Sequence, residues 1–377
     1  MKNIGIICEY NPFHNGHAYQ LARVKEQGNA VCLMSGSYVQ RGEPAVIRKL
    51  DRAEAAVRAG ADLVLELPIT YALRSAEGFA DGGVEIFSRL GIMDALCFGS
   101  ECGNIESLQT LARLMCSEEF SVLLKEKLAG GMSFPSARQQ AAEELGLPGT
   151  ILSNPNDILG VEYCKALYRR NSTIEPVIIK REGSYHESLS EEAPSASVLR
   201  GRSDWKDYMP LSAYELQNVS PRHYISAGER AMLARLRAMN DGEFEALPFG
   251  TEGLWRKLMH SCRQENSLAD ILAATKSKRY THTRLMRMLM CAYLGIEEGL
   301  LTQSVPYVRV LAMNEQGGKL IRAIREQGDI LLLHAGETAP DCAYSRLERR
   351  AEALYGLFSD EATEPPSGHE SVRYCSF

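Results

Sequence analysis

The sequence predicts an α/β fold, a doubly wound parallel sheet followed by a mostly helical second domain. Short apolar runs alternate with amphipathic stretches over roughly the first half of the chain, and glycines stand where these stretches end. Beyond residue 204 the pattern becomes mostly helical. Repeated alternation of strand and helix is typical of a parallel sheet that helices cover on both faces.

The apolar runs lack a regular polar face, as expected for parallel strands that are buried on both sides. They span residues 4–8, 30–34, 62–66, 95–98 and 175–179. The amphipathic segments between them predict helices at 18–25, 52–59 and 76–90, and Gly28, Gly60 and Gly91 follow as helix stops.

The chain of 377 residues is longer than single cores usually grow, which is roughly 250–300 residues, so we expect two domains. A polar stretch, 183–204, suggests a boundary near Asp204. We expect a catalytic domain at 1–204, a mostly helical domain at 205–357 and a loose tail at 358–377. The helices are expected at 211–217, 228–239, 253–262 and 281–294, and a small appended βαβ element at 307–334.

The bulk composition is that of a soluble globular protein, with 45% apolar and 24% charged residues. No apolar run approaches the roughly 20 residues that cross a bilayer, and the first residues lack the pattern of a signal peptide. We therefore expect a cytoplasmic protein without a membrane partner, and no stable protein partner. The ten cysteines form neither a CxxC pair nor a Cys/His cluster, which favours buried free thiols and no metal site.

The segment Asn11-Pro12-Phe13-His14-Asn15-Gly16-His17 joins the first predicted strand to the first helix. Ligands of open α/β sheets bind at this kind of turn, and a helix N-terminus offers unpaired N–H groups to phosphate. Gly16 permits close approach of the backbone, while two imidazoles can stabilise charge at an α-phosphorus under attack. The motif resembles that of nucleotidylyltransferases and class I aminoacyl-tRNA synthetases, and it predicts transfer of an adenylyl group from ATP.

A second segment, 194–200, follows the last predicted strand of the sheet. It resembles the late Ile-Ser-Ser-Thr-x-x-Arg motif of nucleotidylyltransferases, although Pro194 and Ala196 depart from that pattern. Ser195 and Ser197 can cap a helix that faces phosphates, and Arg200 can be their counter-ion. The alternative is a simple helix cap.

Several longer strings resemble one family, the bacterial tRNA(Met) cytidine acetate ligases, over most of the chain. They are Glu9-Tyr-Asn-Pro-Phe-His-Asn-Gly-His17, Met34-Ser-Gly-Ser-Tyr-Val-Gln-Arg-Gly-Glu-Pro-Ala45, Phe98-Gly-Ser-Glu101, Pro155-Asn-Asp-Ile-Leu159 and Lys278-Arg-Tyr-Thr-His-Thr-Arg284. The resemblance implies that ATP activates acetate to acetyl-adenylate. It further implies that the acetyl group passes to N4 of the wobble cytidine in elongator tRNA(Met).

Attack on the α-phosphorus of ATP needs positive charge and N–H donors, so we expect His14, His17 and Arg200 to be catalytic, with Mg²⁺ beside the phosphates. The same resemblance implies an ATP site. Its members are Ile7, Cys8, Glu9, Tyr10, Asn11, Pro12, Phe13, His14, Asn15, Gly16, His17, Gly99, Asn156 and Arg181. Three of these have plain alternatives: Gly99 as a turn glycine, Asn156 as a helix N-cap and Arg181 as an ordinary arginine at a strand end.

Ser35, Gln40 and Arg41 follow the second predicted strand, so they are expected at the same edge of the sheet as the His-x-Gly-His turn. They can receive the acetate carboxylate or the cytidine. Gly36 and Gly42 lie within the same segment, and the alternative is a flexible glycine loop that only caps the sheet.

A tRNA substrate requires a basic surface. Residues 251–290 hold eight Lys/Arg against three acids, a local net charge of +5 in a chain of net charge −6. The RNA-binding residues that we predict are Lys276, Lys278, Arg279, Tyr280 and Arg284, with His282 as a further ring for stacking. The alternative is a solvated basic helix face.

Two other functions fit part of the sequence. A small-molecule nucleotidylyltransferase, which adenylylates a phosphate-bearing metabolite, explains the first domain but not the basic helical one. A non-catalytic RNA-binding protein explains the second domain, but the intact His14, Gly16 and His17 argue against a decayed nucleotide pocket.

Overall fold

The fold is built on one central sheet. The computed structural model describes residues 1–180, 195–202, 204–277, 280–360 and 371–376. Five strands form its parallel part, in the spatial order β5-β2-β1-β6-β7. They are β1 (Lys2–Cys8), β2 (Gly28–Ser35), β5 (Leu63–Leu67), β6 (Ala95–Ser100) and β7 (Glu175–Lys180). These strands confirm the doubly wound α/β prediction, and β1 lies between β2 and β6.

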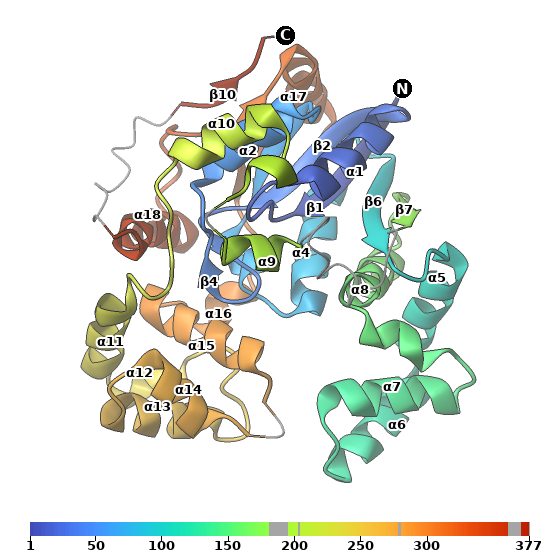
Figure 1. Cartoon of the computed structure of the whole chain (residues 1–377). Helices are drawn as coiled ribbons and strands as arrows, with labels where there is room; N and C mark the ends of the chain where they lie inside the picture. Colours follow the sequence, from blue (N-terminus) through green and yellow to red (C-terminus); the bar gives the residue numbers. More distant parts are fainter. Residues whose placement is uncertain (181–194, 203, 278–279, 361–370, 377) are drawn as a thin grey trace.

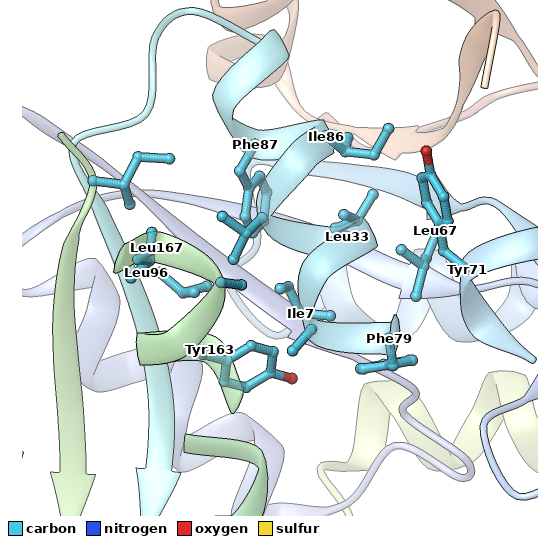
Figure 2. Close-up of a cluster of buried hydrophobic side chains, with 14 of the residues drawn as sticks. Ile7, Leu33, Leu67, Tyr71, Phe79, Ile86, Phe87, Leu96, Tyr163 and Leu167 are labelled. Atoms are coloured by element: carbon cyan, nitrogen blue, oxygen red, sulfur yellow. The ribbon is translucent and has the colours of Figure 1, made fainter. Parts of the chain in front are cut away.

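Helices cover both faces of the sheet because successive strand residues point to opposite sides. Ile7 and Leu33 contribute to one apolar cluster, and Ile6 and Cys32 to the other. Figure 2 shows the first cluster, in which Phe87 and Leu167 come from covering helices. That face is covered by α4 (Ala76–Arg89), α8 (Pro155–Arg169) and α17 (Glu315–Gln327). The other is covered by α1 (Asn15–Lys25), α2 (Lys49–Arg58) and α10 (Leu211–Val219).

The late βαβ element is present, but it extends the main sheet and makes that sheet mixed. It consists of β8 (Tyr307–Met313), α17 and β9 (Leu331–His334), and β8 runs antiparallel to β5. The expected loose tail also contains a strand, because β10 (Arg373–Tyr374) pairs with β8 and Cys375 packs into an apolar cluster of the sheet. The sequence missed both pairings because neither is local. The domain boundary near residue 204 stays a prediction.

The remaining helices gather in two groups, which Figure 1 shows on opposite sides of the molecule. One group has its own core, which includes Leu258, Leu289 and Phe358. It comprises α11 (Glu229–Ala238), α12 (Asp241–Glu245), α13 (Leu254–Gln264), α14 (Leu268–Thr275), α15 (His282–Leu294), α16 (Glu298–Leu301) and α18 (Ala343–Tyr355). The other comprises α5 (Ile105–Leu114), α6 (Glu118–Ala129) and α7 (Phe134–Glu144).

Short elements complete the connections. They are the hairpin β3 (Tyr38–Val39) and β4 (Glu43–Pro44), the helices α3 (Ile69–Ala72) and α9 (Ala196–Arg200), and 3₁₀ turns at Gly149–Ser153, Lys206–Tyr208 and Gly356–Phe358. Within the described ranges, no helix is long and apolar enough to cross a membrane.

Candidate active site

The turn after β1 presents two histidines at the start of α1. His14 is the N-cap: its Nδ1 accepts the Gly16 N–H at 3.1 Å, and the His17 Nδ1 accepts the His14 N–H at 3.3 Å. The two rings stack with centroids 3.8 Å apart. Because each Nδ1 is an acceptor, a neutral ring carries its proton on Nε2, which makes both Nε2–H groups donors suited to phosphate oxygens.

Distant segments hold this turn in place. The Asn11 Oδ1 accepts the Val46 N–H at 2.8 Å, and the Asn11 carbonyl accepts a guanidinium N–H of Arg200 at 3.0 Å. The side-chain amide of Gln217 pairs with the backbone of Phe13, accepting its N–H at 3.0 Å and donating to its carbonyl at 3.2 Å. Gln217 is fully buried on α10. The geometry of this turn is therefore set by residues up to 204 positions away.

Arg200 lies beside the turn, as expected, but the serines before it do not cap the helix. Ser195 stands at the N-cap of α9 without a side-chain cap hydrogen bond, and its hydroxyl lies 2.9 Å from that of Ser197. Burial lowers the pKa of Arg200, while the nearby carboxylates of Glu43 and Glu9 favour its charged form. Arg200 is thus a half-buried cation beside the turn after β1.

Glu9 links the turn to the loop after β2. Its carboxylate accepts the Gln40 N–H at 2.7 Å, and the Gln40 side-chain amide donates to the Arg74 carbonyl at 3.2 Å. Burial raises the pKa of Glu9, against the effects of the Gln40 N–H and of Arg200, Arg41 and Arg52. Gln40 therefore serves the loop's own structure, whereas Arg41 is exposed beside the turn.

Ser35 ends β2 and is fully buried. Its hydroxyl makes no hydrogen bond to any of the described residues. A buried hydroxyl without a partner is costly, so it marks a place where a ligand or a water can bind.

The far side of the site is the junction of β6 with α8. Glu101 accepts the Asn156 side-chain amide at 2.6 Å and the Asp157 N–H at 2.9 Å. Asp157 in turn accepts the Ser100 hydroxyl at 2.5 Å and the Cys102 N–H at 3.0 Å. These reciprocal bonds fix Gly99, which is on β6, and Asn156 near each other. Asn156 is not the N-cap, because α8 begins at Pro155 and its cap is Asn154. Arg181 lies outside the described residues.

Arg52, which the sequence did not reveal as a site residue, lies beneath the segments that follow β1 and β2. It is fully buried on α2 and donates to carbonyls at the ends of both central strands, including that of Glu9 at 2.5 Å and that of Ser35 at 3.1 Å. An arginine within an amphipathic helix gives no signal of such a role. Gln217 was missed for the same reason.

The basic region uses several of its cations internally. The Arg284 guanidinium donates to the Phe249 carbonyl at 2.6 Å and to the Thr251 hydroxyl at 2.9 Å, and it lies over the ring of Tyr280. Burial lowers the pKa of Arg284. Lys276 is exposed. Lys278 and Arg279 lie outside the described residues.

One buried arginine joins the basic region to the loop after β2. Arg287, on α15, donates to the Gln40 carbonyl at 3.3 Å, and burial lowers its pKa to about 10. A Cβ at Gly42 would meet the Arg287 backbone nitrogen at 2.5 Å, so this loop packs directly on α15. The predicted RNA-facing helix is therefore next to the candidate site.

The arrangement suits nucleotide chemistry. Gly99 and the His-x-Gly-His turn lie at the carboxyl ends of the neighbouring strands β6 and β1, whose following helices cover opposite faces. This is the crevice in which open α/β sheets bind nucleotides. Among the described residues, no group of three or more His, Cys, Asp or Glu is placed to hold a metal ion.

Comparisons with known proteins agree with this geometry. Residues 1–369 match the family described as HIGH Nucleotidyl Transferase. The chain is 36% identical to the tRNA(Met) cytidine acetate ligase of Clostridium novyi, over 88% of this chain and 89% of that protein. It is also 36% identical to the enzyme of that name from Alkaliphilus metalliredigens, over 95% of this chain and 94% of that protein.

The structure of Thermotoga maritima TmcAL bound with alpha-thio ATP is similar over the full length of both chains, with a TM-score of 0.89 and 29% sequence identity. The family match, the two relatives and this structure each span most or all of the chain. The protein belongs to the tRNA(Met) cytidine acetate ligase family, within the HIGH nucleotidyl transferases.

Proposed function

We propose that this protein is an ATP-dependent ligase that activates acetate as acetyl-adenylate and transfers the acetyl group to N4 of the wobble cytidine in elongator tRNA(Met). The observation that carries the proposal is the stacked pair His14 and His17 at the N-terminus of α1, with Arg200 bonded to the same turn. The names of the relatives supply the acceptor. We place the reaction in the cytoplasm.

Acetate is a poor acyl donor because its leaving group would be oxide. Attack of its carboxylate on the α-phosphorus of ATP converts it to a mixed anhydride and releases pyrophosphate. This step requires positive charge and N–H donors around the phosphoryl group rather than a protein nucleophile. His14, His17 and Arg200 supply them in the proposal, and Mg²⁺ is included only as a counter-ion of the triphosphate.

The ATP site in the proposal runs from Ile7 to His17 and includes Gly99 and Asn156 across the crevice. The Asn156 amide is already bonded to Glu101, so we assign it a backbone-ordering role as well as ribose contact. Ser35 and Arg41 are the candidates for acetate or cytidine, because one offers an unpartnered hydroxyl and the other an exposed cation at the same edge. Gln40 acts as their support.

In the second step the exocyclic amine of cytidine attacks the acetyl carbon and AMP leaves. The base must be unstacked to reach the pocket, and a wobble base already lies in a loop. The RNA surface in the proposal is the exposed basic side of α13 to α15, with Lys276 as its clearest member. Arg284 supports the loop 249–251 beneath this surface.

The test of the first step is acetate-dependent exchange of labelled pyrophosphate into ATP. The proposal predicts exchange with acetate, loss without it, and no need for RNA. A carboxylate panel should show acetate preferred over longer acids. If a phosphate-bearing metabolite instead retained AMP covalently, the small-molecule nucleotidylyltransferase would be the better description.

A further inference from the structure

We infer that Arg52 is a positioning residue. It holds the end of β2 and the loop after it, which carry the acetate candidates Ser35 and Arg41, against residues 9–17, here called the nucleotide turn. This inference rests on the proposed function. Arg52 lies on α2, beneath the carboxyl ends of β1 and β2, with none of its surface exposed. The bonds of its guanidinium go to backbone carbonyls. Its effect passes through the backbone that it binds.

The contacts of Arg52 converge on four carbonyl groups. Nε donates to the Ile47 carbonyl at 2.8 Å, and Nη1 donates to the carbonyls of Glu9 at 2.5 Å and Ser35 at 3.1 Å. Nη2 donates to the Gly36 carbonyl. Glu9 begins the nucleotide turn, whereas Ser35 ends β2 and Gly36 begins the loop that follows it. One rigid side chain therefore spans the two halves of the site.

The charge of Arg52 is compensated by carbonyl groups. Within the described ranges, Arg52 has no ion pair with a carboxylate, although nearby Glu9 and Glu66 favour its charged form and burial lowers its pKa. A cation removed from water is costly unless hydrogen bonds replace its hydration. The four carbonyls do so, and they fit the planar fork of a guanidinium. A lysine keeps the charge but cannot serve all four.

The two halves depend on Arg52 unequally. The nucleotide turn has supports that do not involve Arg52 or this loop, from Arg200 and Gln217. At the end of β2, the carbonyls of Ser35 and Gly36 face Arg52 instead. Loosening Arg52 should therefore leave ATP binding largely intact and misplace the residues expected to hold acetate.

The test compares Arg52→Lys with Arg138→Lys. Arg138 is also a buried arginine, but it pairs with Glu162 between α7 and α8, away from the turn. In acetate-dependent pyrophosphate exchange, we expect kcat/KM for acetate to fall roughly 100-fold in Arg52→Lys, with the Kd for ATP within about threefold of wild type. Arg138→Lys should lower Tm without a selective loss in kcat/KM for acetate. Equal losses for ATP and acetate, or equal kinetics of the two variants, would overturn the inference.

A second measurement does not depend on activity. Amide hydrogen exchange in peptides covering residues 36–46 should accelerate at least about tenfold in Arg52→Lys and not in Arg138→Lys. Unchanged protection there would refute the inference whatever the enzyme does. If Arg52→Lys fails to fold, Gln40→Ala, which removes the side-chain bond from the same loop to the Arg74 carbonyl, should give the same acetate-selective loss. Absence of exchange activity in wild type would instead refute the proposed function.

Discussion

The turn at residues 9–17 and the basic region at 251–290 organise their polar groups in opposite ways. Distant segments bind the turn, with Gln217 on Phe13 and Arg200 on Asn11. Arg284 in the basic region instead binds its own neighbouring loop. The turn is therefore a rigid, preorganised site, whereas the basic region is a scaffold with a smaller charged surface than its composition suggests. Substitutions in the turn should affect chemistry, and those in the basic region should affect affinity.

The largest expected effect follows from His14→Ala. The change removes both the N-cap acceptor for the Gly16 N–H and a donor to the phosphates, so acetate-dependent pyrophosphate exchange should fall at least about 100-fold. His260→Ala, at an exposed histidine of α13, is the matched control and should stay near wild type. If the exchange rate of His14→Ala stayed within about threefold of wild type, the turn would have no catalytic role.

Gln217→Leu tests whether distant contacts hold the turn. It leaves the N–H and the carbonyl of Phe13 without their partner inside a buried site, so the free energy of unfolding should fall by roughly 2 to 4 kcal/mol. Urea denaturation measures this change. Gln140→Leu, on the exposed side of α7, should change stability little. Equal free energies of unfolding of the two variants would mean that the turn does not depend on Gln217.

His223 tests, through pH, the contact between the loop after β2 and α18 of the helical group. The backbone N–H of His223 donates to the Val46 carbonyl at 2.9 Å, and its ring stacks on Tyr355 of α18. Burial of the imidazole lowers its pKa to about 4. The unfolded chain binds a proton below about pH 6.5 and the folded protein does not, so stability is lost as pH falls toward 4. From about pH 7 to about pH 5 the loss should be roughly 1 to 2 kcal/mol.

His223→Phe keeps the stacked ring and removes the titrating group. Because neither ring nitrogen of His223 makes a hydrogen bond among the described residues, this variant should retain its stability and show a shallower pH dependence. Denaturation curves at several pH values compare the two proteins. If the free energy of unfolding changed equally steeply with pH in His223→Phe and in wild type, a group other than His223 would be responsible.

The smallest expected effect is that of Lys276→Glu. Reversing one exposed charge at the end of α14 should weaken binding of elongator tRNA(Met) roughly three- to tenfold and reduce its salt dependence. Filter binding at several salt concentrations measures this. Lys125→Glu on α6, in the other helical group, is the control for net charge, and unchanged Tm values check folding. Equal losses for both variants would argue for a non-specific charge effect.

The sequence predicted the fold and the turn well because both rest on local patterns. Strand runs such as 30–34, the helix stops Gly60 and Gly91 and the His-x-Gly-His segment each carry their own signal, whereas Gly28, expected as a helix stop, is the first residue of β2. It did not predict β8 against β5, the strand β10, or the roles of Arg52 and Gln217. Those depend on pairing between positions far apart in the chain, which neither periodicity nor composition encodes.

The charge count of the basic region shows the same limit. Residues 251–290 have a net charge of +5, yet Arg284 is bonded to the loop 249–251 and Arg287 is buried against Gln40. Whether a cation faces solvent or a carbonyl is decided by tertiary packing. The sequence therefore located the region correctly as basic but not the side chains that remain for a ligand.

The most direct test of the account is acetyl transfer to RNA. Protein, ATP, Mg²⁺ and [¹⁴C]acetate are incubated with unmodified elongator tRNA(Met), or with the same transcript carrying uridine at the wobble position, and nucleosides are separated after digestion. The account predicts label in N4-acetylcytidine that requires ATP, the wobble cytidine and an intact His14. ATP-dependent release of pyrophosphate with no label on either RNA would contradict it.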